Sequence, residues 1–247
     1  MTLLPELDIK LFADGADIRE IVELAANPLI CGFTTNPTLM RHAGVDDYES
    51  FARKAVEAVP DRPISFEVFA DDFDEMERQA LHISGWGENV HVKIPVTNSR
   101  QKSSTALLQR LVAQDVRVNV TALMTVAQVE TVAEAIEDGP PCFVSVFAGR
   151  IADTGRDPIP VMAQAVEALR SRPQLQLIWA SPREILNVFH AAQAGCQIIT
   201  VTPDLLKKLP LIGKDLDELS LETVHMFHED AAAAGYRLRL HSLSAQG

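Results

Sequence analysis

The chain has 247 residues, of which 47% are hydrophobic, so it can bury a substantial core as one α/β barrel or as two smaller domains. Its net charge of −12 argues against nucleic acid and against anionic membrane surfaces as partners. No apolar run reaches the roughly 18 residues that span a bilayer. The first residues, MTLLPELDIKLF, lack the basic and apolar regions of an export signal. We therefore expect a cytoplasmic protein.

Short strand-like runs alternate with stretches of helical spacing along the whole chain. Strands are predicted at residues 9–14, 30–35, 64–69, 90–96, 117–123, 143–147, 175–180 and 197–201. Helices are predicted at residues 18–26, 46–58, 73–84, 104–114, 126–137, 159–169 and 182–194. The pattern predicts a single (β/α)8 TIM barrel over residues 1–247, with an additional C-terminal helix at 215–235.

An open doubly wound sheet is the alternative architecture. No GxGxxG follows any of the predicted strands, and GxxxxGK[ST] is not found in the sequence. The barrel is therefore the favoured fold.

The cysteines and histidines do not predict a disulfide framework or a metal site. Cys31, Cys142 and Cys196 stand far apart, each in or beside an apolar run, and this is typical of reduced, buried thiols in a cytosolic protein. The sequence contains neither HExxH nor CxxC, and the pair His225 and His228 alone is a weak signal. We expect no metal and no other cofactor.

The strand at 90–96, VHVKIPV, carries Lys93 in the middle of its polar face. In a parallel barrel the helix-facing side of each strand must be apolar, so the polar side points into the barrel. The same alternation directs further polar side chains inward, mostly near the C-terminal strand ends: Asp14, Thr34, Asn36, Glu67, Asn119, Thr121, Ser145 and Ser181. Barrel enzymes keep their chemistry at those ends.

Each of these residues alone has a structural explanation, since a single strand lysine is commonly an edge residue. Taken together they predict a site, because all of them share the inward side and burying a charge there costs several kcal/mol unless it is paired. A barrel built for stability alone would fill its interior with Val, Ile and Leu. A low-dielectric interior disfavours the ammonium relative to the neutral amine, which is the form that attacks a carbonyl to give a Schiff base.

Several motifs resemble the transaldolase family, including its short members and the related fructose-6-phosphate aldolases. They are GFTTNPTLM at 32–40, VKIPVT at 92–97, VNVTAL at 118–123, SVFAGRI at 145–151 and, more loosely, ASPRE at 180–184. The resemblance runs from about residue 11 to the tail helix. It implies Schiff-base chemistry on sugar phosphates, without a cofactor.

The resemblance also implies roles for individual residues. Lys93 would form the Schiff base, and Asp14 would take and return the proton of the substrate hydroxyl. Glu67 and Thr121 would hold the water that relays protons. The substrate would contact a further set, in which Asn36, Asn119 and Ser145 bind hydroxyls, Arg150 and Arg183 bind the phosphate, and Thr34, Phe147 and Ser181 complete the site.

Three functions remain open at this point. The first is transfer of a dihydroxyacetone unit between sugar phosphates, the second is a lyase that releases dihydroxyacetone, and the third is a barrel that only binds metabolites. Fructose-6-phosphate aldolases carry tyrosine at the place of Phe147 and glutamine at the place of Glu67, so this chain matches the transferase. It reads Ser181-Pro182-Arg183 where the family generally has Phe in the middle, and another anionic tail, such as a sulfonate, is therefore an alternative. We also expect a homo-oligomer.

Overall fold

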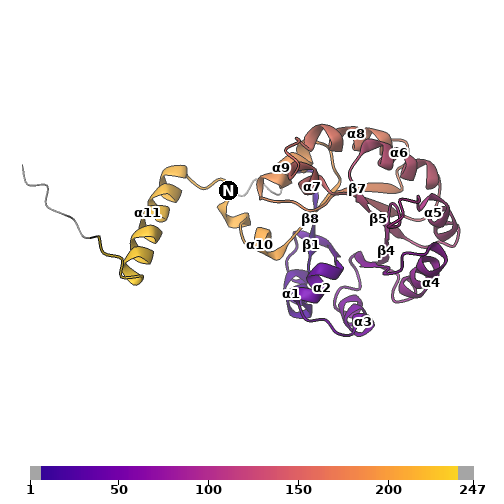
Figure 1. Cartoon of the computed structure of the whole chain (residues 1–247), viewed down its shortest axis with the longest axis horizontal. Coiled ribbons are helices and arrows are strands. Elements are labelled where there is room, and N and C mark those ends of the chain that lie inside the picture. The colour runs from indigo at the N-terminus through magenta and orange to yellow at the C-terminus, as the bar shows by residue number, and fades with distance from the viewer. Residues whose placement is uncertain (1–6, 239–247) are drawn as a thin grey trace, which may run out of the picture. The chain divides into compact units, whose positions relative to one another are not determined.

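The computed structural model describes residues 7–238 and contains a closed barrel of eight parallel strands in chain order, with β8 paired to β1. Figure 1 shows the strands inside a ring of helices. The strands are β1 (Lys10–Asp14), β2 (Ile30–Thr34), β3 (Ile64–Glu67), β4 (Val90–Pro95), β5 (Val118–Leu123), β6 (Cys142–Val146), β7 (Leu175–Trp179) and β8 (Ile198–Val201). The predicted TIM barrel is confirmed.

The helices of the barrel are α1 (Ile18–Ala25), α2 (Pro37–His42), α3 (Tyr48–Ala58), α4 (Phe73–Ser84), α5 (Thr105–Val112), α6 (Val126–Ala135), α7 (Ala148–Ala152), α8 (Ile159–Leu169), α9 (Leu186–Gln193) and α10 (Pro203–Leu206). Helices α1, α2, α3, α4 and α6 each begin at a side chain that caps the helix N-terminus. Asp72, for example, accepts hydrogen bonds from the amides of Asp74 and Glu75 at the start of α4.

The core has the layers expected of the alternating pattern. Helix α4 buries Met76, Ala80 and Ile83, which lie on one helical face. Inside the barrel, the His91 ring stacks on Phe143 with centroids 4.2 Å apart. Burial lowers the pKa of His91 to about 4, so this imidazole is neutral at pH 7.

The structure corrects several details of the predicted elements. Strand β3 ends at Glu67, two residues before the end of the predicted strand at 64–69, and Phe69 is 55% exposed in the following loop. The amide of Phe69 donates to the side chain of Gln79, so it has left the sheet ladder. The helix predicted at 182–194 begins only at Leu186, because Ser181 adopts a positive φ of 61° and Pro182 follows it.

The short helices α2, α7 and α10, which follow strands directly, were not predicted as helices. They contain four to six residues each and lack the periodic apolar stripe of a longer helix. The prediction of three buried thiols is wrong for Cys31, which is exposed where the pairing of β1 with β2 shifts register, whereas Cys142 and Cys196 are buried.

Contacts divide the described chain into the barrel unit, which ends at Leu209, and a C-terminal unit, which begins at Pro210. A short 3-10 helix (Leu209–Leu211) stands at this boundary, and the C-terminal unit contains α11 (Leu216–Ala233). No helix within residues 7–238 is both long and apolar enough to cross a membrane. The single-domain organisation remains a prediction, and the parts of it at residues 1–6 and 239–247 lie outside the described residues.

Candidate active site

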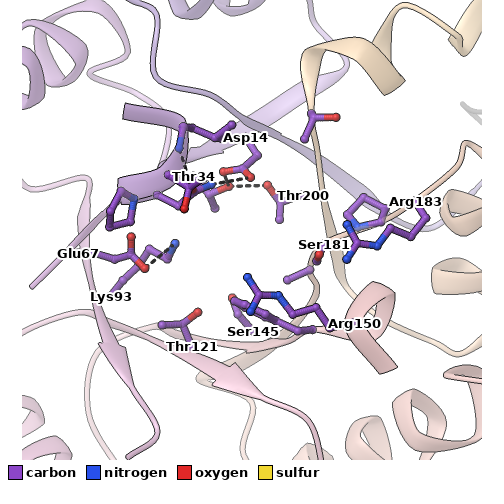
Figure 2. Close-up of a pocket in the computed structure, with 18 residues that line it drawn as sticks. Asp14, Thr34, Glu67, Lys93, Thr121, Ser145, Arg150, Ser181, Arg183 and Thr200 are labelled. Atoms are coloured by element: carbon purple, nitrogen blue, oxygen red, sulfur yellow. Dashed lines mark hydrogen bonds and ion pairs between the residues drawn. The ribbon is translucent and has the colours of Figure 1, made fainter. Parts of the chain in front are cut away.

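A cavity of about 360 Å³ opens at the C-terminal ends of the strands. Most of the predicted site residues line it, although they come from strands spread around the whole barrel. Figure 2 shows Asp14, Glu67 and Lys93 on one side of this cavity and Arg150 and Arg183 on the other. The predicted residues in its wall are Asp14, Thr34, Asn36, Glu67, Lys93, Thr121, Ser145, Phe147, Arg150, Ser181 and Arg183.

Lys93 lies in β4 with only 6% of its surface exposed. Its Nζ donates to the backbone carbonyl of Thr35 at 2.6 Å and lies 3.3 Å from the Glu67 carboxylate. The register of the barrel creates this pair, because Glu67 and Lys93 are direct neighbours across β3 and β4. The lysine therefore has a carboxylate beside it that can take a proton when the amine attacks a carbonyl.

Glu67 and Thr121 each present a buried oxygen to the cavity that lacks a partner among the described residues: Oε2 of Glu67 and Oγ1 of Thr121. Buried polar atoms are normally hydrogen-bonded, so these two atoms call for a water or a substrate hydroxyl. Burial raises the pKa of Glu67, although the nearby Lys93 ammonium opposes this rise. A raised pKa suits a group that exchanges protons near neutral pH.

Asp14 ends β1 and is held by two polar neighbours. The Thr34 hydroxyl donates to Oδ1 at 2.9 Å, and the Asn36 amide donates to Oδ2 at 3.2 Å. Burial raises the pKa of Asp14, whereas the Lys93 ammonium and these hydrogen bonds lower it by smaller amounts. The cavity thus contains a second carboxyl group with a raised pKa, separate from the ion pair of Lys93.

Asn119 does not line the cavity. It is fully buried in β5, where its amide donates to Ser65 Oγ at 3.1 Å and its carbonyl accepts from Ser145 Oγ at 2.7 Å. These contacts orient Ser145, which does reach the cavity. Direct binding of a substrate hydroxyl by Asn119 remains a prediction.

The two arginines belong to the segments after β6 and β7, and those segments touch closely at Gly149. A Cβ at this position would lie 1.6 Å from the Ser181 carbonyl oxygen, so only glycine fits. The Arg150 guanidinium stacks over the Phe147 ring at 4.9 Å. Arg183 forms a half-exposed ion pair with Asp153, whose carboxylate accepts from Nε at 3.1 Å and also from Nη2.

The sequence analysis missed one inward-facing residue, Thr200 of β8. Its hydroxyl lies 2.5 Å from that of Thr34, which in turn donates to Asp14. Thr200 is the polar residue of a strand that reads IITV, and the alternation that identified the other strands' polar faces was present here as well. Among residues 7–238, no three His, Cys, Asp or Glu side chains are placed to hold a metal ion.

Comparison with known proteins identifies the family of the chain. A family model described as transaldolase/fructose-6-phosphate aldolase matches residues 11–238. A probable transaldolase of Dehalococcoides mccartyi is 34% identical over 81% of this chain and 90% of its own length. Another, from Chelativorans sp., is 35% identical over 85% of this chain and 94% of its own.

Solved structures with little sequence similarity share the barrel. The 3-hexulose-6-phosphate synthase of Salmonella typhimurium is similar with a TM-score of 0.56 and 14% identity, over 78% of this chain and 89% of that one. Dihydrodipicolinate synthase of Rhodopseudomonas palustris gives the same TM-score and identity over 90% of this chain and 79% of that one. At such identities the likeness concerns the fold alone. The family match and the relatives above 30% identity place the chain in the transaldolase/fructose-6-phosphate aldolase family.

Proposed function

We propose that the protein is a Schiff-base transaldolase, which moves a dihydroxyacetone unit from a ketose phosphate to an aldose phosphate. The observation that carries this proposal is the buried Lys93 amine at the cavity, with Glu67 at 3.3 Å and the second carboxyl group, Asp14, in the same cavity wall. A lysine in that setting can act as a nucleophile, and two separately placed carboxyl groups can serve two different proton transfers.

The reaction would begin when Lys93 Nζ attacks the ketone carbon of the donor. Glu67 would take the proton that the ammonium gives up, and a water held between Glu67 and Thr121 would carry a proton to the departing hydroxyl as the imine forms. Asp14 would then remove the proton of the donor hydroxyl next to the bond to be broken. That C–C bond would break, its electron pair would pass into the imine to give an enamine, and the aldose phosphate would leave.

The enamine would next attack the carbonyl carbon of the acceptor. Asp14 would return its proton to the new alkoxide, and water would hydrolyse the imine to release the new ketose phosphate and free Lys93. Because each proton that these residues take up is returned within the cycle, the cycle consumes no cofactor. The experiment that tests the proposal is incubation with fructose 6-phosphate and an aldose phosphate, followed by NMR. A new ketose phosphate is the expected product. If no new ketose phosphate forms, the proposal is refuted.

Arg150 and Arg183 in the cavity wall support an anionic donor, since a chain of charge −12 would otherwise repel an anion. A charge-assisted hydrogen bond contributes about 1.5–3 kcal/mol, so each of Arg150→Ala and Arg183→Ala is expected to lose roughly ten- to a hundredfold in kcat/KM for phosphorylated donors. Arg150 is expected to show the larger loss, because Arg183 is also paired with Asp153. Steady-state kinetics with fructose 6-phosphate and with free fructose measure the difference.

The control for this comparison is Arg170→Ala, which removes an exposed arginine paired with Glu167 on α8. It is expected to leave both donors unaffected. An equal loss for charged and uncharged donors in the Arg150 and Arg183 variants would show that these residues do not bind the anion. Parallel assays with phosphate- and sulfonate-bearing ketoses decide between the two anionic tails.

The lyase, which releases free dihydroxyacetone, is the second candidate because the family contains both activities. Phe147 favours transfer, since a phenyl ring next to the cavity cannot donate a proton to the enamine, whereas a phenol can. We expect Phe147→Tyr, alone or with Glu67→Gln, to raise the rate of dihydroxyacetone release relative to transfer. The measurement is the ratio of the two products with and without acceptor. Rapid release by the unmodified protein, independent of acceptor, would favour the lyase.

The proposal also includes a cytoplasmic location and assembly into a homo-oligomer. Helix α11 supports assembly, because it carries exposed apolar side chains at Leu221, Val224 and Phe227. Sedimentation analysis of the full chain measures the oligomeric state.

A further inference from the structure

Strands β2 and β3 separate after Thr34 and Ser65, and the backbone groups that follow bind other partners. The strands pair only at Phe33 with Ile64 and at Thr34 with Ser65, followed by one more amide bond from Thr35 to the Ser65 carbonyl at 3.2 Å. In a parallel ladder the next hydrogen bond would join the Glu67 amide to the Thr35 carbonyl.

Two other groups take over that missing hydrogen bond. The Thr35 carbonyl accepts from Lys93 Nζ at 2.6 Å, and the Glu67 amide donates to the Tyr48 hydroxyl at 2.8 Å. The same hydroxyl donates to the Glu67 carbonyl at 3.0 Å. One phenol therefore satisfies both backbone groups of Glu67, while the lysine holds the carbonyl that the ladder would have used.

The Tyr48 hydroxyl is held in place by the packing of its ring. Tyr48 is the first residue of α3, and its ring makes edge contacts with Phe66, Phe69 and Trp86 at centroid distances of 6.3, 4.5 and 5.7 Å. Burial raises the pKa of Tyr48, so the hydroxyl keeps its proton and can donate. Tyr48 is not among the residues that line the cavity.

We propose that Tyr48 is a positioning residue for the Schiff-base step: its hydroxyl fixes the end of β3 so that Glu67 reaches Lys93, and it leaves the Thr35 carbonyl free to hold the lysine. The inference rests on the proposed function, because it assigns Glu67 and Lys93 to imine formation. Figure 2 shows how closely these two side chains approach each other, and a small shift of β3 would part them. Displacements of about 1 Å at a catalytic group can cost on the order of a hundredfold in rate.

The test is Tyr48→Phe, which keeps the ring and removes only the hydroxyl. Without it, the Glu67 amide can close the ladder onto Thr35 and compete with Lys93. We expect imine formation, followed by borohydride trapping in a single turnover, to slow by roughly ten- to a hundredfold, while the KM of the donor and the C–C cleavage step change little. In a Glu67→Ala background, Tyr48→Phe is expected to slow imine formation only a little further, because both substitutions act on that one step.

The matched control is Tyr236→Phe, which alters the only other tyrosine of the sequence, a residue that is 82% exposed. It is expected to trap the donor at the unmodified rate. A Tyr48→Phe protein that also traps at that rate would overturn the inference. So would an equal loss of every step together with a lowered melting temperature, because that result indicates a purely structural role.

A second measurement covers the case in which Tyr48→Phe does not fold. With tyrosine labelled at Cζ, the full chain gives two resonances, and Lys93→Met is expected to shift that of Tyr48 but not that of Tyr236, since Thr35 then becomes free for the Glu67 amide. An unchanged Tyr48 resonance would contradict the coupling. If the unmodified protein forms no trapped adduct, the proposed function fails, and the same resonances still decide whether Tyr48 and Lys93 are coupled.

Discussion

Lys93→Met is expected to remove transaldolase activity and borohydride trapping together, with a loss of roughly 10⁴-fold or more, as for other covalent nucleophiles. The methionine fills a similar volume in β4 but cannot form an imine. Glu67 would lose its ion-pair partner at 3.3 Å. Because burial already raises the pKa of Glu67, we expect it to take up a proton, so that no unpaired charge stays buried. The fold is therefore expected to survive, and circular dichroism with mass spectrometry of the trapped adduct measures both properties.

Lys10→Met is the control for this experiment. Lys10 also lies in a barrel strand, β1, but it is exposed and stands at the opposite end of its strand from Asp14. The control should trap the donor normally. Trapping by the Lys93 variant at the unmodified rate would mean that a different amine carries the intermediate.

Asp14→Ala and Glu67→Ala are expected to stop the reaction at different steps, each with a loss of about 10²- to 10⁴-fold in its own step. Asp14 lies apart from the lysine pair, held by Thr34 and Asn36, so its loss should leave imine formation intact and block C–C cleavage. Glu67 adjoins Lys93, so its loss should slow imine formation and hydrolysis. Single-turnover trapping measures imine formation, and release of the aldose phosphate measures cleavage.

The two variants serve as controls for each other, because each removes one partly buried carboxylate from the same cavity. Their Schiff-base adducts are expected to accumulate to different extents: the Asp14 variant should collect the donor imine, and the Glu67 variant should not. Equal loss of both steps in both variants would contradict the division of proton transfers.

Much of this cavity could be predicted from strand alternation alone. Once a barrel is assumed, the alternation of side chains along each strand decides which of them face inward. The position along the strand decides how near each lies to the C-terminal end of the barrel. Lys93 and Glu67 were placed correctly in this way, and the register of β3 and β4 then makes them neighbours. The same rule would have found Thr200, whose strand is otherwise apolar.

Other features depended on geometry that alternation does not contain. Asn119 has the inward parity, but it is fully buried, and its side chain is hydrogen-bonded to Ser65 and Ser145. The end of β3 is set by the Tyr48 hydroxyl from α3, a tertiary contact that replaces a ladder hydrogen bond. Arg183 and Asp153 pair between the segments after β7 and β6, which approach closely at Gly149 of α7, and neither segment carries a local signal of this approach.

In the proposed reaction, Lys93 carries the dihydroxyacetone unit. The most direct measurement is to reduce the unmodified protein with borohydride in the presence of fructose 6-phosphate alone, digest it, and locate the added mass by peptide mass spectrometry. We expect the mass of one reduced dihydroxyacetone unit on the peptide that contains Lys93 and on no other. An adduct on another lysine, or complete absence of an adduct while transfer still proceeds, would contradict this role of Lys93.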